Sequence, residues 1–278
     1  MQRERVSEDV YVFTSDLYAQ VTAGAVITPS GTILIDTLPY PQETREIKSF
    51  LEDRLETTVR YVINTHYHAD HSYGTCFFPG AVVASHTRCR ELLDTIGRSG
   101  LEEAQAQVPE LADVHIVLPD VIFEQGCLNI HLDDKTVTLL PSPGHSPDSI
   151  IVLIPEERVL FASDTLMPVP TLVDGNLEDL IRSLEAIPDM PVDNVVQGHG
   201  EVILRGEIQS VVDDDIRYLR TIHERVTRVI KNGGGPDQLQ RHDIESCGKS
   251  RIPLNGLVSD LHMANLYRLY QQFRESSS

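Results

Sequence analysis

The sequence has few of the features that mark membrane-bound or exported proteins. None of its apolar runs approaches the roughly 18 residues that a membrane-spanning helix needs. The opening residues, MQRERVSEDV, contain no apolar segment of the kind that a secretory signal peptide carries. We therefore expect a cytoplasmic protein that does not bind a membrane.

Cysteine is also scarce. The four cysteines lie far apart and form no CxxC pair (Cys76, Cys89, Cys127 and Cys247). This spacing is typical neither of a disulfide framework nor of a zinc site built from thiolates. We interpret all four as buried or idle thiols.

Basic residues are outnumbered, with 23 Lys and Arg against 42 Asp and Glu, which gives a net charge of −19. A surface this acidic repels phosphate backbones, so we expect no nucleic-acid partner. Bound divalent cations would offset part of the charge where acidic residues converge. The 278 residues, 41% of them hydrophobic, suffice for one large domain or a domain with an appendage.

Short strands and helices alternate in the first two thirds of the chain. Runs rich in β-branched residues predict strands, and apolar residues at helical spacing predict helices between some of them. The predicted strands cover residues 10–14, 24–27, 32–35, 60–64, 81–84, 121–123, 128–132, 137–140, 150–154 and 159–162. The predicted helices cover residues 41–55, 86–96 and 101–108.

One pattern occurs twice. The segments GAVITPSGTILIDT, residues 24–37, and SIIVLIPEERVLFASDT, residues 149–165, both consist of strand, turn, strand and then Asp-Thr. A single copy in each half, without a shorter period, predicts two related β/α halves and not a solenoid.

The pattern changes after Gly200 to long amphipathic helices. One runs through residues 208–230 and stops at Asn232 and three glycines, and a second runs through residues 258–273. We assign residues 1–231 to one main domain and residues 232–278 to a C-terminal helical extension packed on it. The residues from Glu275 onward are expected to fray.

The strongest local signal is the motif HxHxDH, which directly follows the predicted strand 60–64. An extended backbone would direct His66 and His68 to one face, and a turn at Ala69 would carry Asp70 and His71 to an adjoining position. The motif therefore predicts two neighbouring half-sites for metal ions.

Three more candidate ligands follow apolar strands further along the chain. They are His145 in SPGHSPDS, Asp164 in LFASDT and His199 in VVQGHGE. Imidazole and carboxylate ligands suit zinc where no thiolate is adjacent. The other histidines lack ligand spacing and are predicted to be surface or core residues, with His223 and His262 within reach of the mouth of the site.

In the order of these motifs the chain resembles the metallo-β-lactamase superfamily, over roughly residues 10–205. The resemblance implies a four-layer α/β/β/α sandwich, here followed by the C-terminal helical extension. It also implies two metal ions, which we expect to be zinc, with iron or manganese as alternatives. By this resemblance, one ion is held by His66, His68 and His145, the other by Asp70, His71 and His199, and Asp164 bridges the two.

Two zinc ions about 3.5 to 4 Å apart can share a hydroxide, because each lowers the pKa of bound water toward about 7. We expect this hydroxide to cleave an ester, thioester or related acyl bond of a small molecule, with Asp70 as the catalytic residue that orients it. Asp36, at the end of the first repeated hairpin, is expected either to support a metal ligand or to cap the following turn.

The resemblance leaves the substrate open, because function in such folds depends on the loops. Acyl-homoserine lactonases typically carry a tyrosine where this chain has Met167, and true β-lactamases generally lack the bridging Asp and are exported. The acidic charge disfavours RNA, and the basic glutathione-binding tail of glyoxalase II is not recognisable. A β-lactam or phosphodiester hydrolase, an iron oxidoreductase similar to persulfide dioxygenases, and a non-catalytic metal-binding protein stay as alternatives.

The substrate pocket is predicted to be formed by segments near the strand ends, namely residues 37–41, Tyr67, Tyr73 and residues 166–176. Met167, Val169 and Leu172 would give it an apolar wall suited to a small or acyl-type substrate, although packing of a buried loop would explain them equally. The helices after Gly206 are expected either to cover the site or to form a contact between two copies of the chain.

Overall fold

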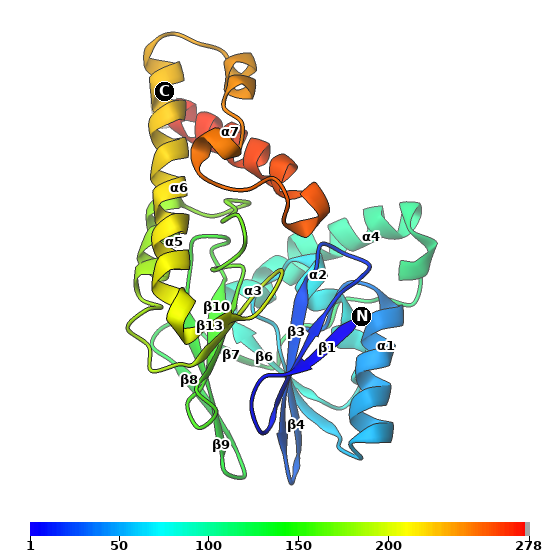
Figure 1. Ribbon diagram of the computed structural model, residues 1–278. Helices are drawn as coiled ribbons and strands as arrows, with labels where there is room; N and C mark the ends of the chain where they lie inside the picture. Colours follow the sequence, from blue (N-terminus) through cyan, green and yellow to red (C-terminus); the bar gives the residue numbers. More distant parts are fainter. Residues whose placement is uncertain (276–278) are drawn as a thin grey trace.

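Two mixed β-sheets lie face to face in the computed structural model (Figure 1). The structure describes residues 1–275. Of the chain end that is expected to fray, residues 276–278 lie outside the described part. The seven-stranded sheet runs in chain order through β1 (Gln2–Arg5), β2 (Val10–Thr14), β3 (Thr22–Thr28), β4 (Gly31–Ile35), β5 (Val59–Ile63), β6 (Val82–His86) and β7 (Val121–Phe123). The six-stranded sheet has the order β13 (Ile203–Leu204), β12 (Asn194–Gln197), β11 (Val159–Ser163), β10 (Ile150–Ile154), β9 (Lys135–Pro141) and β8 (Leu128–Leu132).

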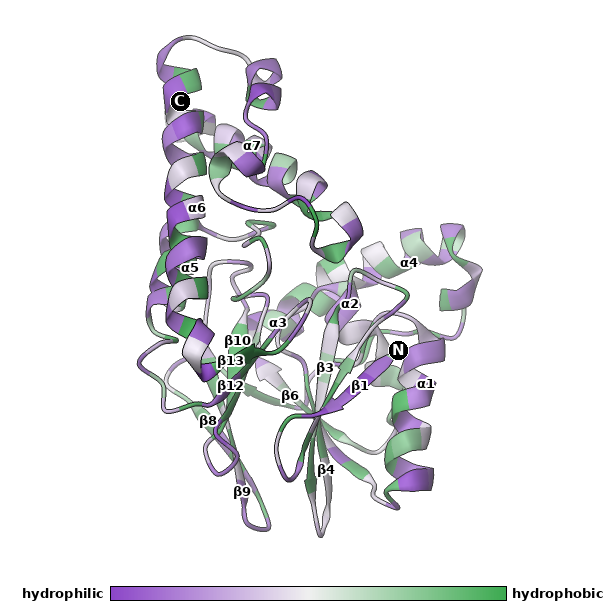
Figure 2. Cartoon of the chain, in the orientation of Figure 1, coloured by the Kyte–Doolittle hydropathy of each residue, from purple (hydrophilic) through white to green (hydrophobic). Residues whose placement is uncertain are grey.

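The facing sides of the two sheets form the inner core. Val26 and Ile35 of the first sheet share one buried cluster with Val137, Val152 and Phe161 of the second. Alternate side chains of a strand point to opposite faces, so the outer face of each sheet needs a cover of its own. β1 needs none, since its residues QRER are exposed, and charged side chains on an edge strand discourage pairing with another chain (Figure 2).

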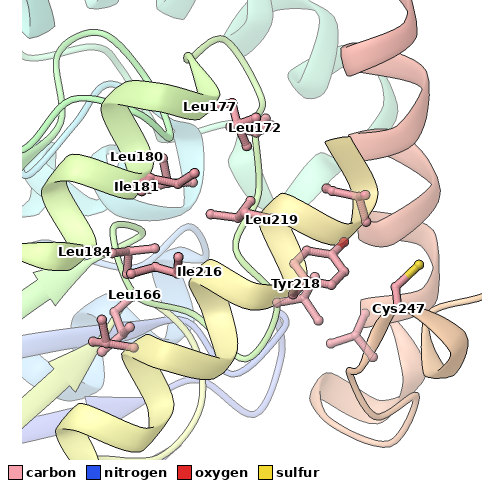
Figure 3. Close-up of a cluster of buried hydrophobic side chains, with 14 of the residues drawn as sticks. Leu166, Leu172, Leu177, Leu180, Ile181, Leu184, Ile216, Tyr218, Leu219 and Cys247 are labelled. Carbon is pink, nitrogen blue, oxygen red and sulfur yellow. The ribbon is translucent and has the colours of Figure 1, made fainter. Parts of the chain in front are cut away.

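Helices cover the two outer faces. On the first sheet, α1 (Pro41–Ser49) places Ile47 against Leu34. On the second, α5 (Leu177–Glu185), α6 (Arg205–Lys231) and α7 (Val258–Glu275) contribute Leu184, Leu219 and Leu266 to one cluster that also contains Leu160 of β11. Figure 3 shows Leu184 and Leu219 in this cluster. The order helix, sheet, sheet, helix confirms the α/β/β/α sandwich with a helical C-terminal part. No helix within residues 1–275 is both long enough and apolar enough to cross a lipid bilayer.

The remaining α-helices are short, namely α2 (Ala69–Ser72), α3 (Thr87–Leu92) and α4 (Arg98–Gln107). Of these, α3, like α1, continues with a wider π-helical turn. The predicted helix 41–55 changes to a π-helical turn over Phe50–Arg54, and the predicted helix 86–96 does the same over Leu93–Gly97.

The sequence patterns locate most elements but miss β1, β13 and α5. β1 has no apolar residue and β13 has two residues, so neither carries a strand pattern. α5 did carry a signal, because its buried residues Leu177, Leu180, Ile181 and Leu184 stand at helical spacing behind the Asn176 side chain, which caps the helix.

The strands place the predicted ligands at sheet edges. β4 and β5 are parallel, as are β11 and β12, so each pair ends at one edge of its sheet. The Thr22 N–H donates to the carbonyl of Gly198 at 2.9 Å, and Val21 forms a β-bridge with His199. These contacts join the two sheets beside the loops that carry the HxHxDH motif and its later partners.

Candidate metal centre

The HxHxDH segment changes from extended backbone to helix at Ala69. His68 has φ −60° and ψ 148°, and α2 begins at the next residue. The helical turn moves Asp70 and His71 to a second position beside His66 and His68, as the spacing of the motif predicts.

The ring nitrogens of three histidines converge on one point. His68 Nδ1 lies 2.9 Å from His66 Nε2 and 3.0 Å from His145 Nε2. Asp164 adds a carboxylate oxygen, with its Oδ2 3.2 Å from His145 Nε2. The four ligand atoms lie within 4.8 Å of one another. Three imidazoles and one carboxylate are a donor set that suits tetrahedral zinc.

Asp70, His71 and His199 form a second group, whose ligand atoms also lie within 4.8 Å of one another. Asp70 Oδ2 is 3.4 Å from His199 Nε2 and 3.8 Å from His71 Nε2. The other oxygen of Asp164, Oδ1, faces this group at 3.1 Å from His71 Nε2 and 3.6 Å from His199 Nε2. Folding thus brings all seven candidate ligands together, and one carboxylate faces both groups.

The outward nitrogens of the histidine rings are held by hydrogen bonds. His145 Nδ1 donates to the carbonyl of Thr171, and His199 Nδ1 donates to the carbonyl of Ala19, both at 2.9 Å. A carbonyl oxygen only accepts, so the proton sits on Nδ1 and the lone pair of Nε2 points into the ligand group. Both rings are therefore oriented for metal binding.

Asp174 holds the His68 ring by its Nε2 atom, whereas His145 and His199 are held by Nδ1. Its Oδ2 lies 3.4 Å from His68 Nε2, which leaves Nδ1 of that ring for the ligand group, and it also accepts a hydrogen bond from the hydroxyl of Tyr67. This role of Asp174 could not be predicted from sequence, because an acidic residue in a loop has no motif spacing to the HxHxDH segment.

Two buried atoms of the centre lie 3.1 Å from each other, yet neither has a hydrogen-bond partner within the described part of the chain. They are His71 Nε2 and Asp164 Oδ1. A buried polar atom without a partner is costly, and native proteins rarely keep one unless something else binds it. Since both atoms belong to the ligand groups, the residues present fit a divalent metal.

The charges of the two groups differ. Burial lowers the pKa of His145 to about 4 and the pKa of His66 well below its usual range, so both rings are neutral, the form that binds a metal. In the second group, the neighbouring charges outweigh burial. His71 and His199 lower the pKa of Asp70 to about 2, and Asp164 raises the pKa of His199 to about 10. A cation bound there replaces a proton on the ring, so we expect metal uptake to release protons.

A cavity of about 280 Å³ opens over the ligands. Side chains of the candidate ligands form its floor. Its walls are formed by Tyr18, Ala19, Ala69, Met167, Thr171 and Val173 and, from the C-terminal segment, by Leu254, Leu257 and Leu261. The C-terminal part of the chain therefore covers the site, one of the two roles expected for it.

Several residues predicted for the pocket lie elsewhere. Val169 and Leu172 are buried in the core cluster beneath α5 and α6. Tyr73 packs with Leu101 and Leu111 in a separate cluster. Apolar loop residues look the same in sequence whether they face a ligand or the core, so only Met167 of the three proposed wall residues lines the cavity.

The two helix histidines do not reach the cavity mouth. His262 is buried and hydrogen-bonded to the Tyr218 hydroxyl at 3.0 Å and the His242 carbonyl at 2.7 Å. The ring of His223 packs against that of Phe273. Both are structural residues of the α6 and α7 pair.

A family model, described as the metallo-beta-lactamase superfamily, matches residues 18–199. The chain belongs to the metallo-beta-lactamase superfamily. Its matched region contains all seven candidate ligands, from His66 to His199, and the superfamily assignment agrees with the fold.

Curated relatives match about 70% of the chain. The chain is 26% identical over 208 residues to a beta-lactamase-like protein 2 homolog of Caenorhabditis elegans, which covers 73% of this chain and 63% of that protein. It is 24% identical over 207 residues to an atrochrysone carboxyl ACP thioesterase of Aspergillus terreus, covering 68% and 54%. The chain thus spans between about half and two thirds of the length of these relatives.

Among solved structures, the stereoselective inverting sec-alkylsulfatase Pisa1 from Pseudomonas sp. has a TM-score of 0.77 and 16% identity, covering 98% of this chain and 50% of that chain. This likeness shows the shared fold. Together, the family, its hydrolase members and the His/Asp cluster indicate a metal-dependent hydrolase at the superfamily level.

Proposed function

We propose that this protein is a dinuclear zinc hydrolase that cleaves an ester, thioester or related acyl bond of a small molecule. The observation that carries the proposal is the position of Asp164, whose Oδ2 lies 3.2 Å from His145 Nε2 while its Oδ1 lies 3.1 Å from His71 Nε2. A carboxylate so placed suits a pair of adjacent cations. Two divalent cations bound there would lower the pKa of water toward about 7 and so supply a nucleophile at neutral pH.

The chain's own residues would position that water and the substrate. Asp70 lines the cavity and is ionised, since its pKa is about 2, so its carboxylate can accept a hydrogen bond that orients the attacking water. Tyr18 also lines the cavity, and the charge of Asp70 raises its pKa to about 12. Its hydroxyl therefore keeps its proton and can donate a hydrogen bond to a substrate oxygen.

The cavity favours an acyl substrate over an anionic one. Among the described residues that line it, none is a lysine or arginine. A phosphodiester or the carboxylate of a β-lactam is commonly bound by such a cation, above all by arginine. The thioesterase among the relatives supports the same choice.

Zinc is the metal we propose, because imidazole nitrogens and carboxylate oxygens make up both ligand groups and no cysteine belongs to either. Iron and manganese use similar ligands, so the metal and the reaction need one joint test. The cytoplasmic location and a homodimer stay predictions.

The test combines metal analysis of the purified protein with a substrate panel for the zinc-loaded form. We expect two zinc ions per chain and hydrolysis of p-nitrophenyl acetate and a simple thioester. The panel also contains a lactone, a phosphodiester, a β-lactam and, because of the alkylsulfatase fold neighbour, an alkyl sulfate.

Three results would contradict the proposal. An iron-loaded preparation that consumes oxygen with a persulfide would make the protein an oxidoreductase. Turnover confined to the phosphodiester, β-lactam or sulfate would assign another bond type. Stoichiometric zinc without turnover of any substrate would leave a non-catalytic metal-binding protein.

A further inference from the structure

Three apolar side chains line the cavity outside the hydrophobic clusters of the described residues. Met167, Val173 and Leu257 contact the cavity, yet none of the hydrophobic clusters formed by the described residues contains them. Val173 is 47% exposed and Leu257 is 37% exposed, whereas Met167 is 3% exposed and faces the cavity from a buried position. Core packing therefore does not explain why Val173 and Leu257 are apolar.

The backbone holds Leu257 at the rim of the cavity. Leu254 and Asn255 have left-handed φ angles of 53° and 55°, and this kink precedes α7. Leu254 and Val258 are buried in the cluster under α6 and α7, so the segment is anchored on both sides of Leu257. Leu261 follows Leu257 by one helical turn and lines the same cavity. The chain thus places a strip of leucines over the metal ligands.

No basic side chain beside this strip would bind an anion. Asp70 and Asp164 are candidate metal ligands, so the two cations of the proposed zinc form would offset their charges, and no lysine or arginine belongs to the part of the lining that the structure describes. A carboxylate or phosphate seated against the leucines would lose its hydration without gaining a partner charge. The cavity of about 280 Å³ is also at the small end of ligand sites, which run from roughly 300 to 1,000 Å³.

We infer that Met167, Val173 and Leu257 form an acyl-binding wall that receives the uncharged hydrocarbon part of the substrate, and that Leu257 determines specificity against charged acyl groups. This inference rests on the proposed function and narrows its substrate class to esters or thioesters of short, uncharged acyl groups. The C-terminal segment then completes the active site and selects the substrate.

Binding of hydroxamic acids to the zinc-loaded protein tests the inference without requiring turnover. Calorimetry compares acetohydroxamic, butanohydroxamic, hexanohydroxamic and succinohydroxamic acid, the last of which carries a carboxylate at its far end. Each methylene transferred from water to an apolar wall is worth about fourfold in affinity. For the native protein, we expect the Kd to fall by roughly that factor for each added methylene. The Kd of the succinyl compound should be at least tenfold higher than that of the hexanoyl compound.

Leu257→Arg is the decisive variant, since a cation at the rim should favour the charged acyl group. We expect it to reduce the preference for hexanoyl over succinyl by at least tenfold, and this ratio cancels any change in how tightly the hydroxamate group itself is bound. Leu204→Arg adds the same charge at a leucine that is 58% exposed and outside the cavity, and should leave the preference unchanged. Leu257→Ala, which adds no charge, should only flatten the dependence on chain length.

The outcomes separate the inference from the proposed function. If acetohydroxamic acid binds but chain length has no effect, or if Leu257→Arg leaves the preference unchanged, the acyl-binding wall is wrong and the metal centre stands. If acetohydroxamic acid fails to bind the zinc-loaded protein, the metal centre itself is wrong and the inference falls with it.

Discussion

His71 Nδ1 lies 2.8 Å from Oδ2 of Asp36, a buried carboxylate at the end of β4. The same carboxylate accepts hydrogen bonds from the backbone N–H of Thr65 at 2.8 Å and from its hydroxyl at 2.7 Å. Asp36 thereby orients the ring so that Nε2 points toward Asp164. The sequence left two roles open for Asp36, support of a metal ligand or capping of a turn. Its contact with His71 favours the first role.

Asp36→Asn should weaken metal binding. Asparagine keeps the size of the side chain and tolerates the left-handed φ of 56° at this position, but it removes the negative charge facing His71. We expect metal affinity to fall by about 10 to 100-fold, measured by competition with a chromophoric chelator. Asp133→Asn is the control, because Asp133 also has a left-handed φ, of 53°, and is exposed. Unchanged affinity with a large loss of thermal stability would assign Asp36 to capping a turn.

Asp164→Ala should lower metal content and hydrolysis together. The substitution removes the one carboxylate that faces both ligand groups. We expect fewer than two bound metal ions per chain and a loss of at least 100-fold in kcat/KM, about 2.7 kcal/mol in transition-state stabilisation. Elemental analysis and ester hydrolysis are measured on the same sample. Full metal content with unchanged turnover would refute the bridging role.

Gly198→Ala should disturb the centre through Asp164. A Cβ at this position would overlap Oδ1 of Asp164 and lie 2.7 Å from the backbone carbon of Ser163. We expect lower metal affinity, because the carboxylate must move. Gly206→Ala is the matched control, since nothing lies within 4 Å of the Cβ there. Equal metal affinity in the two variants would show that the carboxylate tolerates the displacement.

Asn265→Leu should loosen the loop that holds His145. The buried Asn265 of α7 accepts from the Leu172 N–H at 2.8 Å and donates to the Pro170 carbonyl at 2.7 Å, on either side of the Thr171 carbonyl that binds His145. Leucine leaves both backbone groups unpaired, each costing about 1 to 3 kcal/mol. We expect lower unfolding free energy in urea and weaker metal binding, whereas Asn129→Leu at an exposed position should alter neither. A loss of stability with unchanged metal affinity would show that α7 does not position His145.

Asp215→Asn should change how stability depends on pH. Burial raises the pKa of Asp215 to about 7, against the opposing charge of Lys249 and with a smaller contribution from Asp214. Because the folded protein holds this proton more tightly than the unfolded chain, the contribution of Asp215 to stability is full below pH 3.8 and is lost as the pH rises to about 7. Asparagine does not ionise and removes this loss.

The quantity to measure is the difference in unfolding free energy between the native protein and Asp215→Asn in urea at pH 5, 6, 7 and 8. From pH 5 to pH 8 we expect it to move in favour of the variant by on the order of 2 kcal/mol and then to level off. A difference that stays constant over this range would show that Asp215 is ionised throughout, as a partner of Lys249.

The family and the ligand set were predictable because both depend on local chemistry. His66, His68, Asp70 and His71 lie within six consecutive positions, where chain geometry alone determines which side chains meet. Most strands were predictable because buried strands need continuous apolar runs, and the four-layer arrangement of the two sheets followed from the resemblance to the superfamily. α5 was missed although it has an amphipathic pattern, whereas β1 lacks any apolar residue by which to find it.

The sequence by itself thus determined the superfamily, the two-sheet architecture and the seven candidate ligands, since each follows from residue type, spacing and order along one chain. Only the tertiary structure decided that Asp174 orients His68, that Tyr18 lines the cavity and that Leu257 lies at its rim. The reason is physical. These contacts join residues far apart in the chain, and the packing of α7 on the core that brings them together is not a property of any local pattern.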